Sequence, residues 1–261
     1  MDSTFIRNKF DEFKCESDEQ LIGHWLNLVD LFHSKSNFDG PSIEKRLKTI
    51  QNVLKRLSNE IIILEDPYYW MLEEIHPDQI IKGACLMNRK EQLLAHLSQI
   101  ILDPSKTDPK FIEYLKTEAQ VYYNVKLRKI KEAVKLAKKV KKILKDEHGI
   151  DNPEPHHFYP ACKDLLYGNL LLFSQNESVI LNCPHIEMKD INFDKYELFL
   201  KSYSVFLWDI SCDGKTPELN DNVDVTQLLY INSPDKILIM DGNWISRIER
   251  SGLEHYLKNV N

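Results

Sequence analysis

Hydrophobic residues follow two different spacings along the 261-residue chain, and the spacing changes near residue 148. Before that point, apolar side chains recur every three or four residues, which is typical of amphipathic helices. The clearest stripe runs from Ser42 to Glu65 and ends before Pro67. An earlier stripe consists of Leu21, Trp25, Leu28 and Phe32. We therefore expect residues 1–148 to form a helical bundle.

Two further helices are predicted in this first region. One contains residues 93–101 and ends before Asp103-Pro104, and the longest covers about 111–146. The apolar stripe of the long helix consists of Leu127, Ile130, Val134, Ala137, Val140 and Leu144.

After a break at residues 149–155, the apolar runs become short and resemble strands. Two antiparallel hairpins are predicted, together with one further strand and one helix. The hairpins comprise 170–173 with 179–181 and 227–231 with 236–240, the strand 205–208, and the helix 193–202. The predicted fold class is α+β, with the bundle (1–148) followed by a small, mostly antiparallel sheet with flanking helices (149–261).

The composition narrows the range of functions. Hydrophobic residues make up 43% and charged residues 28%, as in globular proteins, whereas only 8 glycines are present, which disfavours glycine-rich phosphate loops. The five cysteines form no Cys-x-x-Cys pair, so reduced thiols are expected. The chain begins without a signal-like apolar segment and has no apolar stretch long enough to span a membrane. We expect a cytoplasmic protein with no membrane span.

Positive charge is concentrated in residues 126–145. This segment contains ten basic residues and one acidic residue, Glu132. The rest of the chain has 24 basic and 39 acidic residues, so its formal net charge is -15, whereas the formal net charge of this segment is +9. Such a segment can bind nucleic-acid phosphates, an anionic membrane surface or an acidic protein, or it can simply solvate an exposed helix face. The residues expected to contact nucleic acid are Lys126, Arg128, Lys129, Lys131, Lys135, Lys138, Lys139 and Lys142.

His156-His157, Pro160 and Asn169-Leu170 together resemble the start of an HNH nuclease motif. The resemblance implies that His157 is a general base, that Asn169 orients a hairpin, and that His156 binds a divalent metal such as Mg²⁺ or Mn²⁺. In the alternative interpretation, the histidine pair caps a hairpin or lies exposed in a loop.

The same segment contains residue types that bind zinc. His157 and Cys162 have a His-x4-Cys spacing, and Cys183 and His185 have a Cys-x-His spacing. These four residues could hold Zn²⁺ if a hairpin returned to its start. Otherwise the cysteines are expected to be buried as small hydrophobic residues.

Arg89 and His96 form an Arg-x6-His pair that resembles the active-site spacing of HEPN ribonucleases, which need no metal. Arg250 and His255 form a second, shorter pair. Three functions therefore stay open. We favour a nucleic-acid-binding module that uses the basic helix. The alternatives are a nuclease, if the protein is an enzyme at all, and a protein-interaction subunit whose apolar stripes pair with a partner or a second copy.

Overall fold

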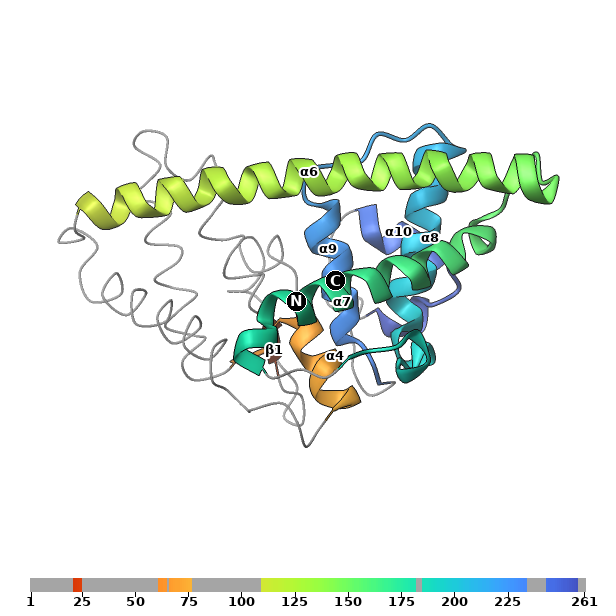
Figure 1. Ribbon diagram of the computed structural model, residues 1–261. Coiled ribbons are helices and arrows are strands. Elements are labelled where there is room, and N and C mark those ends of the chain that lie inside the picture. Colours follow the sequence, from red (N-terminus) through yellow and green to blue (C-terminus); the bar gives the residue numbers. More distant parts are fainter. Residues whose placement is uncertain are drawn as a thin grey trace. The chain divides into compact units, whose positions relative to one another are not determined.

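The computed structural model describes residues 21–24, 61–64, 66–76, 109–181, 185–233 and 243–257 (Figure 1). The chain divides into two compact units. Unit 1 comprises residues 1–66 with 81–125, and unit 2 comprises residues 67–80 with 126–261. The predicted boundary at residue 148 stays a prediction.

Unit 1 contains a parallel pair of short strands where the sequence predicted helices. Strand β1 (Leu21–His24) pairs with β2 (Ile61–Leu64), and Leu21 lies opposite Ile61. The helical prediction was wrong for these eight residues. Three consecutive β-branched residues in β2 favour an extended backbone, and pairing between segments far apart in sequence overrides the local period. The rest of the helices predicted at 42–65 and 93–101 lies outside the described residues, as do Leu28 and Phe32.

The longest predicted helix is confirmed as α6 (Pro109–His148). It ends at Gly149, which adopts a left-handed backbone conformation with φ of 67°. The amide of Gly149 donates to the carbonyl of Lys145, and the amide of Ile150 donates to that of Leu144. The bond from Gly149 to Lys145 is the αL type of helix cap, a motif that glycine supports because it has no Cβ. The predicted break after residue 148 is therefore confirmed.

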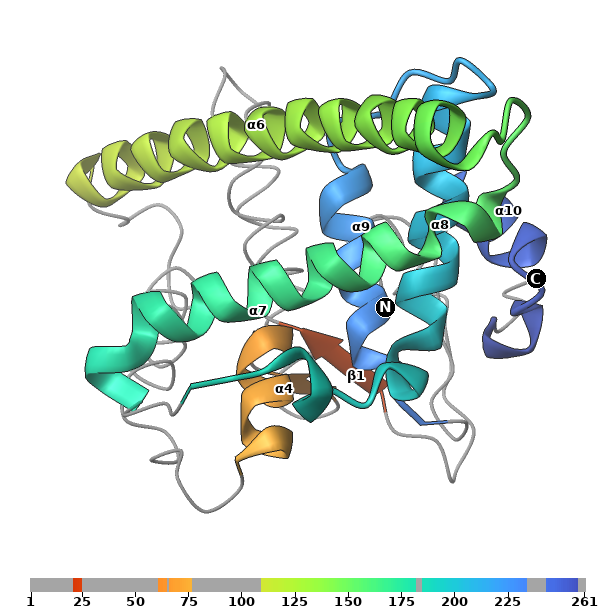
Figure 2. The same cartoon turned by 45° about the vertical axis from the view of Figure 1, so that its right-hand side comes forward.

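Unit 2 is built around α8 (Glu197–Ser211), and 11 of the 15 residues of this helix are buried. Three helices pack against α8: α7 (Tyr159–Leu181), α9 (Asp221–Gln227) and α10 (Asn243–Arg250). Helix α4 (Pro67–Ile75) packs against α7. Residues 126–148 of α6 lie across the ends of α8 and α9 (Figures 1 and 2). Short 3-10 helices complete the unit, namely η3 (Pro155–Phe158), η4 (Met188–Asp190), η5 (Phe193–Tyr196), η6 (Leu228–Tyr230) and η7 (Glu254–Tyr256).

The predicted α+β class is wrong, because the described part of residues 149–261 contains helices and no β-strand. The hairpin at 170–181 lies within α7. Its buried side chains recur every four residues, which is a helical period that the short apolar runs obscured. This buried stripe consists of Cys162, Leu166, Leu170 and Ser174 of α7, and it continues back to Phe158 of η3.

The strand predicted at 205–208 is the centre of α8. A continuous apolar run fits a buried strand and a buried helix equally well, and here the helix is apolar on almost every side because other elements surround it. The predicted helix at 193–202 is confirmed in type, since η5 and then α8 cover those residues.

The second predicted hairpin is also corrected. Residues 227–231 cover the last residue of α9, then η6 and the residue after it, and all five are buried. Its expected partner strand, 236–240, lies outside the described residues. Within the described ranges, no helix combines the length and the apolar character needed to cross a bilayer.

Candidate functional site

The part of α6 in unit 2 has one buried face and one strongly basic exposed face. Small apolar side chains at Ala133, Ala137 and Val140 are buried, together with Leu144 one turn further on. The rotation of the helix is also fixed by hydrogen bonds. Lys141 Nζ donates to the Ser211 carbonyl at the end of α8, at 2.8 Å. The opposite face of α6 therefore points to solvent.

Five lysines on the solvent side have no hydrogen bond or ion pair within the part of the chain that the structure describes. We call them the lysine face, which comprises Lys131, Lys135, Lys138, Lys139 and Lys142. All five are exposed. At 100° per residue they fall within an arc of roughly 100°, and at 1.5 Å per residue they span about 17 Å of helix. Lysines three or four residues apart on a helix have Cβ atoms about 5–6 Å apart, which is within the Debye length of about 8 Å at physiological salt, so the like charges on this face repel one another.

The other basic residues of the segment have partners. Arg128 and Lys129 both contact the Glu132 carboxylate at 3.7 Å, and Lys145 pairs with Asp151 at 3.3 Å. Lys126, which the sequence placed among the nucleic-acid contacts, is only 5% exposed. Its ammonium donates to Asn220 Oδ1 at 2.9 Å, so it points into unit 2 and away from solvent.

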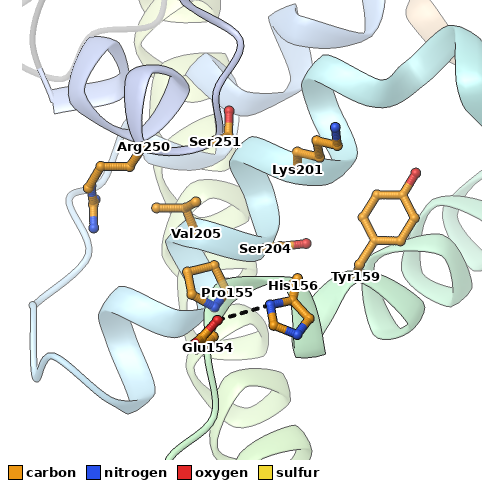
Figure 3. Close-up of a pocket in the computed structure, with 9 residues that line it drawn as sticks. All are labelled: Glu154, Pro155, His156, Tyr159, Lys201, Ser204, Val205, Arg250 and Ser251. Atoms are coloured by element: carbon orange, nitrogen blue, oxygen red, sulfur yellow. Dashed lines mark ion pairs between the residues drawn. The ribbon is translucent and has the colours of Figure 1, made fainter.

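The structure does not form the hairpin that an HNH-like site requires. His157 lies in η3, where its Nδ1 accepts a hydrogen bond from the Glu154 amide at 2.9 Å. Asn169 lies ten residues into α7, roughly 15 Å along the helix from Tyr159. His156 pairs with the Glu154 carboxylate at 3.3 Å (Figure 3). The histidine pair therefore caps η3, and the structure does not bring His157 and Asn169 to one site.

Of the four residues considered for zinc, His157, Cys162 and His185 are described, whereas Cys183 lies outside the described residues. Cys162 is fully buried, and its Sγ lies 3.3 Å from Ser204 Oγ. Burial raises the pKa of the Cys162 thiol to about 12, which disfavours the thiolate that zinc binds. Among the described residues, no group of three or more His, Cys, Asp or Glu side chains could hold a metal ion.

Arg89 and His96 lie outside the described residues, so the HEPN-like pair stays a prediction. The second pair is described. Arg250 donates two hydrogen bonds to Asp209. His255 lies in η7, and the centre of its ring lies 4.2 Å from the centre of the Tyr256 ring.

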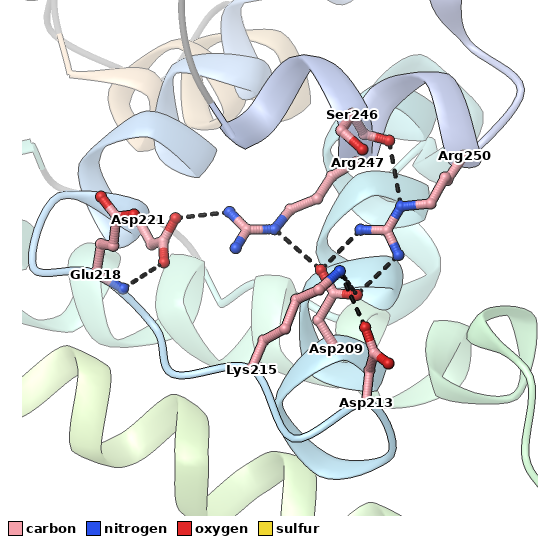
Figure 4. A network of polar contacts seen from close by, with 8 residues as sticks. All are labelled: Asp209, Asp213, Lys215, Glu218, Asp221, Ser246, Arg247 and Arg250. Carbon is pink, nitrogen blue, oxygen red and sulfur yellow. Dashed lines mark hydrogen bonds and ion pairs between the residues drawn. The ribbon is translucent and has the colours of Figure 1, made fainter.

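A buried ionic network that the sequence analysis did not predict joins three helices of unit 2 (Figure 4). Arg247 of α10 is at its centre, with its side chain 6% exposed. It donates from Nη1 to Asp221 of α9 at 2.6 Å and from Nε to Asp209 of α8 at 3.3 Å. Its guanidinium also lies 4.8 Å from the ring centre of Phe206 and 4.6 Å from that of Trp244. Arginine suits this position because its planar group can donate and stack at once.

Asp209 receives further donors at the edge of the network. Arg250 binds its two carboxylate oxygens at 2.7 Å each, and Lys215 binds Oδ1 at 3.2 Å and also contacts Asp213 at 3.0 Å. Burial by itself raises the pKa of Asp209, but hydrogen bonds and charges from Arg250 and Lys215 outweigh this effect and hold the pKa below its ordinary value.

The network balances three carboxylates with three cations, and its ion pairs hold α8, α9 and α10 together. The available sequence signal was the Arg-x-x-Arg spacing on α10, which places both guanidinium groups on one side of a helix. That signal does not reveal the acidic partners, which lie 26 to 41 residues away.

Comparisons with other proteins identify no relative of this chain. The chain matches no protein-family model, and searches of curated proteins and of solved structures found no match.

Proposed function

We propose that the protein binds nucleic acid through the lysine face of α6. The observation that carries the proposal is the set of five exposed lysines with no partner in the part of the chain that the structure describes. A duplex carries about one phosphate charge per 1.7 Å of axis when both strands are counted, so about 17 Å of duplex carries roughly ten phosphates, of which those on one side can face the lysines. Phosphate contacts would relieve the repulsion among the lysines and release counterions from the nucleic acid.

Nucleic acid fits this face better than a membrane or a protein does. Helices that lie in a bilayer surface insert an apolar face, but the apolar face of this segment is buried in unit 2. Protein interfaces depend on buried aromatic and apolar anchors. The exposed large hydrophobic residues of the described part are scattered, and only Leu127 lies in the basic segment. A phosphate backbone needs only the point charges that lysines supply.

The lysine face supplies charge without base recognition. It contains no arginine, asparagine or glutamine, the side chains that form two hydrogen bonds with one base edge, and no aromatic residue on which a base could stack. We therefore expect binding that depends on salt and little on base sequence, and that does not change when EDTA is added.

The test is fluorescence anisotropy with labelled DNA and RNA, each single- and double-stranded, over a salt series with Mg²⁺ or with EDTA. The triple variant K135Q/K138Q/K142Q removes three lysines of the face, and K189Q/K195Q/K201Q is its control. The control removes the same charge at lysines paired with Glu187, Glu74 and Glu197. For three lost phosphate contacts on a duplex, the slope of log K against log salt should become shallower by about 2.7.

Three results would overturn the proposal: equal weakening by both triple variants, affinity that does not change with salt, or tighter binding to phosphatidylserine vesicles than to any nucleic acid. Cleavage of the nucleic acid that EDTA abolishes would instead support a metal-dependent nuclease.

A further inference from the structure

A cavity of about 490 Å³ lies between η3, the start of α7, α8 and the end of α10 (Figure 3). It is separate from the lysine face, since none of its lining residues belongs to α6. Its volume is within the range of about 300–1,000 Å³ that small-molecule sites occupy. The cavity is therefore large enough for an organic ligand, and its lining indicates which kind.

The walls are mainly apolar. The apolar part of the lining includes Pro155, the Tyr159 ring and the buried side chain of Val205. Lys163 does not line the cavity, but its Nζ lies over the Tyr159 ring, 4.9 Å from the ring centre. Burial, followed by the charges of Asp194 and Glu197, raises the pKa of Tyr159, so its hydroxyl is neutral at pH 7.

Each ionisable group that lines the cavity, apart from the Tyr159 hydroxyl, has a partner. His156 contacts Glu154, Lys201 contacts Glu197, and Arg250 binds Asp209 through two hydrogen bonds. A charged ligand would have to displace one of these partners or remain without a counter-ion in a largely apolar space. The pairing therefore favours an uncharged ligand.

Two serines determine which hydrogen-bonding group fits. Ser204 Oγ donates to the Leu200 carbonyl at 2.7 Å, and Ser251 Oγ donates to the Ile248 carbonyl at 2.6 Å. Each hydroxyl has one hydrogen, which these bonds use. Ser204 Oγ also lies 3.3 Å from Cys162 Sγ, and Ser251 Oγ lies 3.5 Å from Ser202 Oγ, so each oxygen has one lone pair left for a donor from a ligand. Both serines line the cavity (Figure 3). They are suited to accept a hydrogen bond from a ligand.

We propose that this cavity binds a small, uncharged, largely apolar molecule that carries a hydrogen-bond donor. Its apolar body lies against Pro155, Tyr159 and Val205, and its hydroxyl or N–H group donates to Ser204 or Ser251. The site is independent of the lysine face and of any nucleic-acid binding.

Three probes with one ring system test the ligand class. 2-Naphthol has a neutral donor, 2-methoxynaphthalene has no donor, and 2-naphthoate has a negative charge. We expect isothermal titration calorimetry to show that 2-naphthol binds at least about 10-fold more tightly than either of the others, which corresponds to about 1.4 kcal/mol.

Matched variants test the location. S251F places a ring in the cavity, whereas S246F places the same ring at an exposed position on α10 that does not line it. H156W fills the cavity from η3, at a side chain that is 69% exposed, so it serves if S251F does not fold. Circular dichroism identifies which variants are folded. S251F and H156W should weaken 2-naphthol binding at least about 10-fold, whereas S246F should leave it within about 2-fold.

Three results would overturn the proposal: no binding of 2-naphthol by the wild type at 1 mM, tighter binding of 2-naphthoate, or unchanged affinity in a folded cavity-filling variant.

Discussion

Arg250 donates one hydrogen bond from each of its two terminal nitrogens to the two carboxylate oxygens of Asp209, both at 2.7 Å. This two-point contact joins the end of α10 to the buried side of α8, where the Asp209 side chain is 1% exposed. The same carboxylate accepts from Arg247 and Lys215. Three helices and one loop of unit 2 are thus tied through a network in which Asp209 is the shared acceptor.

Removing the charge of Asp209 should destabilise the protein strongly. D209N leaves buried Arg247 without one carboxylate partner, and removing one partner of a buried pair typically costs about 3–5 kcal/mol. Urea denaturation measures the change in the free energy of unfolding. D213N is the matched control, because Asp213 is exposed and contacts only Lys215 among the described groups, so its loss should cost no more than about 1 kcal/mol. Equal effects of the two variants would contradict the central role of Asp209.

Stability should also depend on pH through Asp209. Its pKa is lower in the folded state than its ordinary value, so the unfolded chain binds the proton more readily. The contribution of Asp209 is therefore complete above the ordinary pKa of about 3.9 and declines as the pH falls from there towards the folded pKa. Urea midpoints between pH 5 and pH 2.5 should fall more steeply for the wild type than for D209N. Parallel curves would show that Asp209 is not responsible.

The two described cysteines should differ in reactivity. Burial raises the pKa of Cys162 to about 12, and its side chain is inaccessible, whereas Cys212 is half-buried. Alkylation requires an accessible thiolate. With iodoacetamide at pH 8, the peptide that contains Cys162 should be labelled at least about 100-fold more slowly than the peptide that contains Cys212. Peptide mass spectrometry measures both rates, and in denaturant the difference should disappear.

Alanine substitution at two glycines should have opposite effects. Gly149 has φ of 67°, a conformation that costs a residue with a Cβ about 1–2 kcal/mol, so G149A should destabilise the protein. Gly168 lies inside α7, and a Cβ there would have no heavy atom within 4 Å. G168A should therefore stabilise it by about 0.5–1 kcal/mol, because alanine loses less backbone entropy in a helix. Thermal denaturation distinguishes the two signs, and a loss of stability in G168A would contradict the helical placement.

At residues 156–170 the structure contradicts the backbone conformation that an HNH-like site needs. The residue types resemble an HNH nuclease, but that chemistry depends on a hairpin that brings His157 and Asn169 together. In the structure, η3 and α7 cover these residues, so the two side chains are separated along a helix. Spacing along a chain determines a distance only when the backbone conformation is known.

Features that depend on neighbours along the chain could be predicted without knowledge of the fold. The three-to-four spacing of apolar residues predicts the long basic helix, and Gly149 predicts its end, because both follow from bonds within a few residues. The other features depend on contacts between distant segments. A short apolar run fits a strand or a buried helix until packing selects one, as it did for α8. Packing also decided which lysines are available, because it buried Lys126 against Asn220 and left the lysine face in solvent.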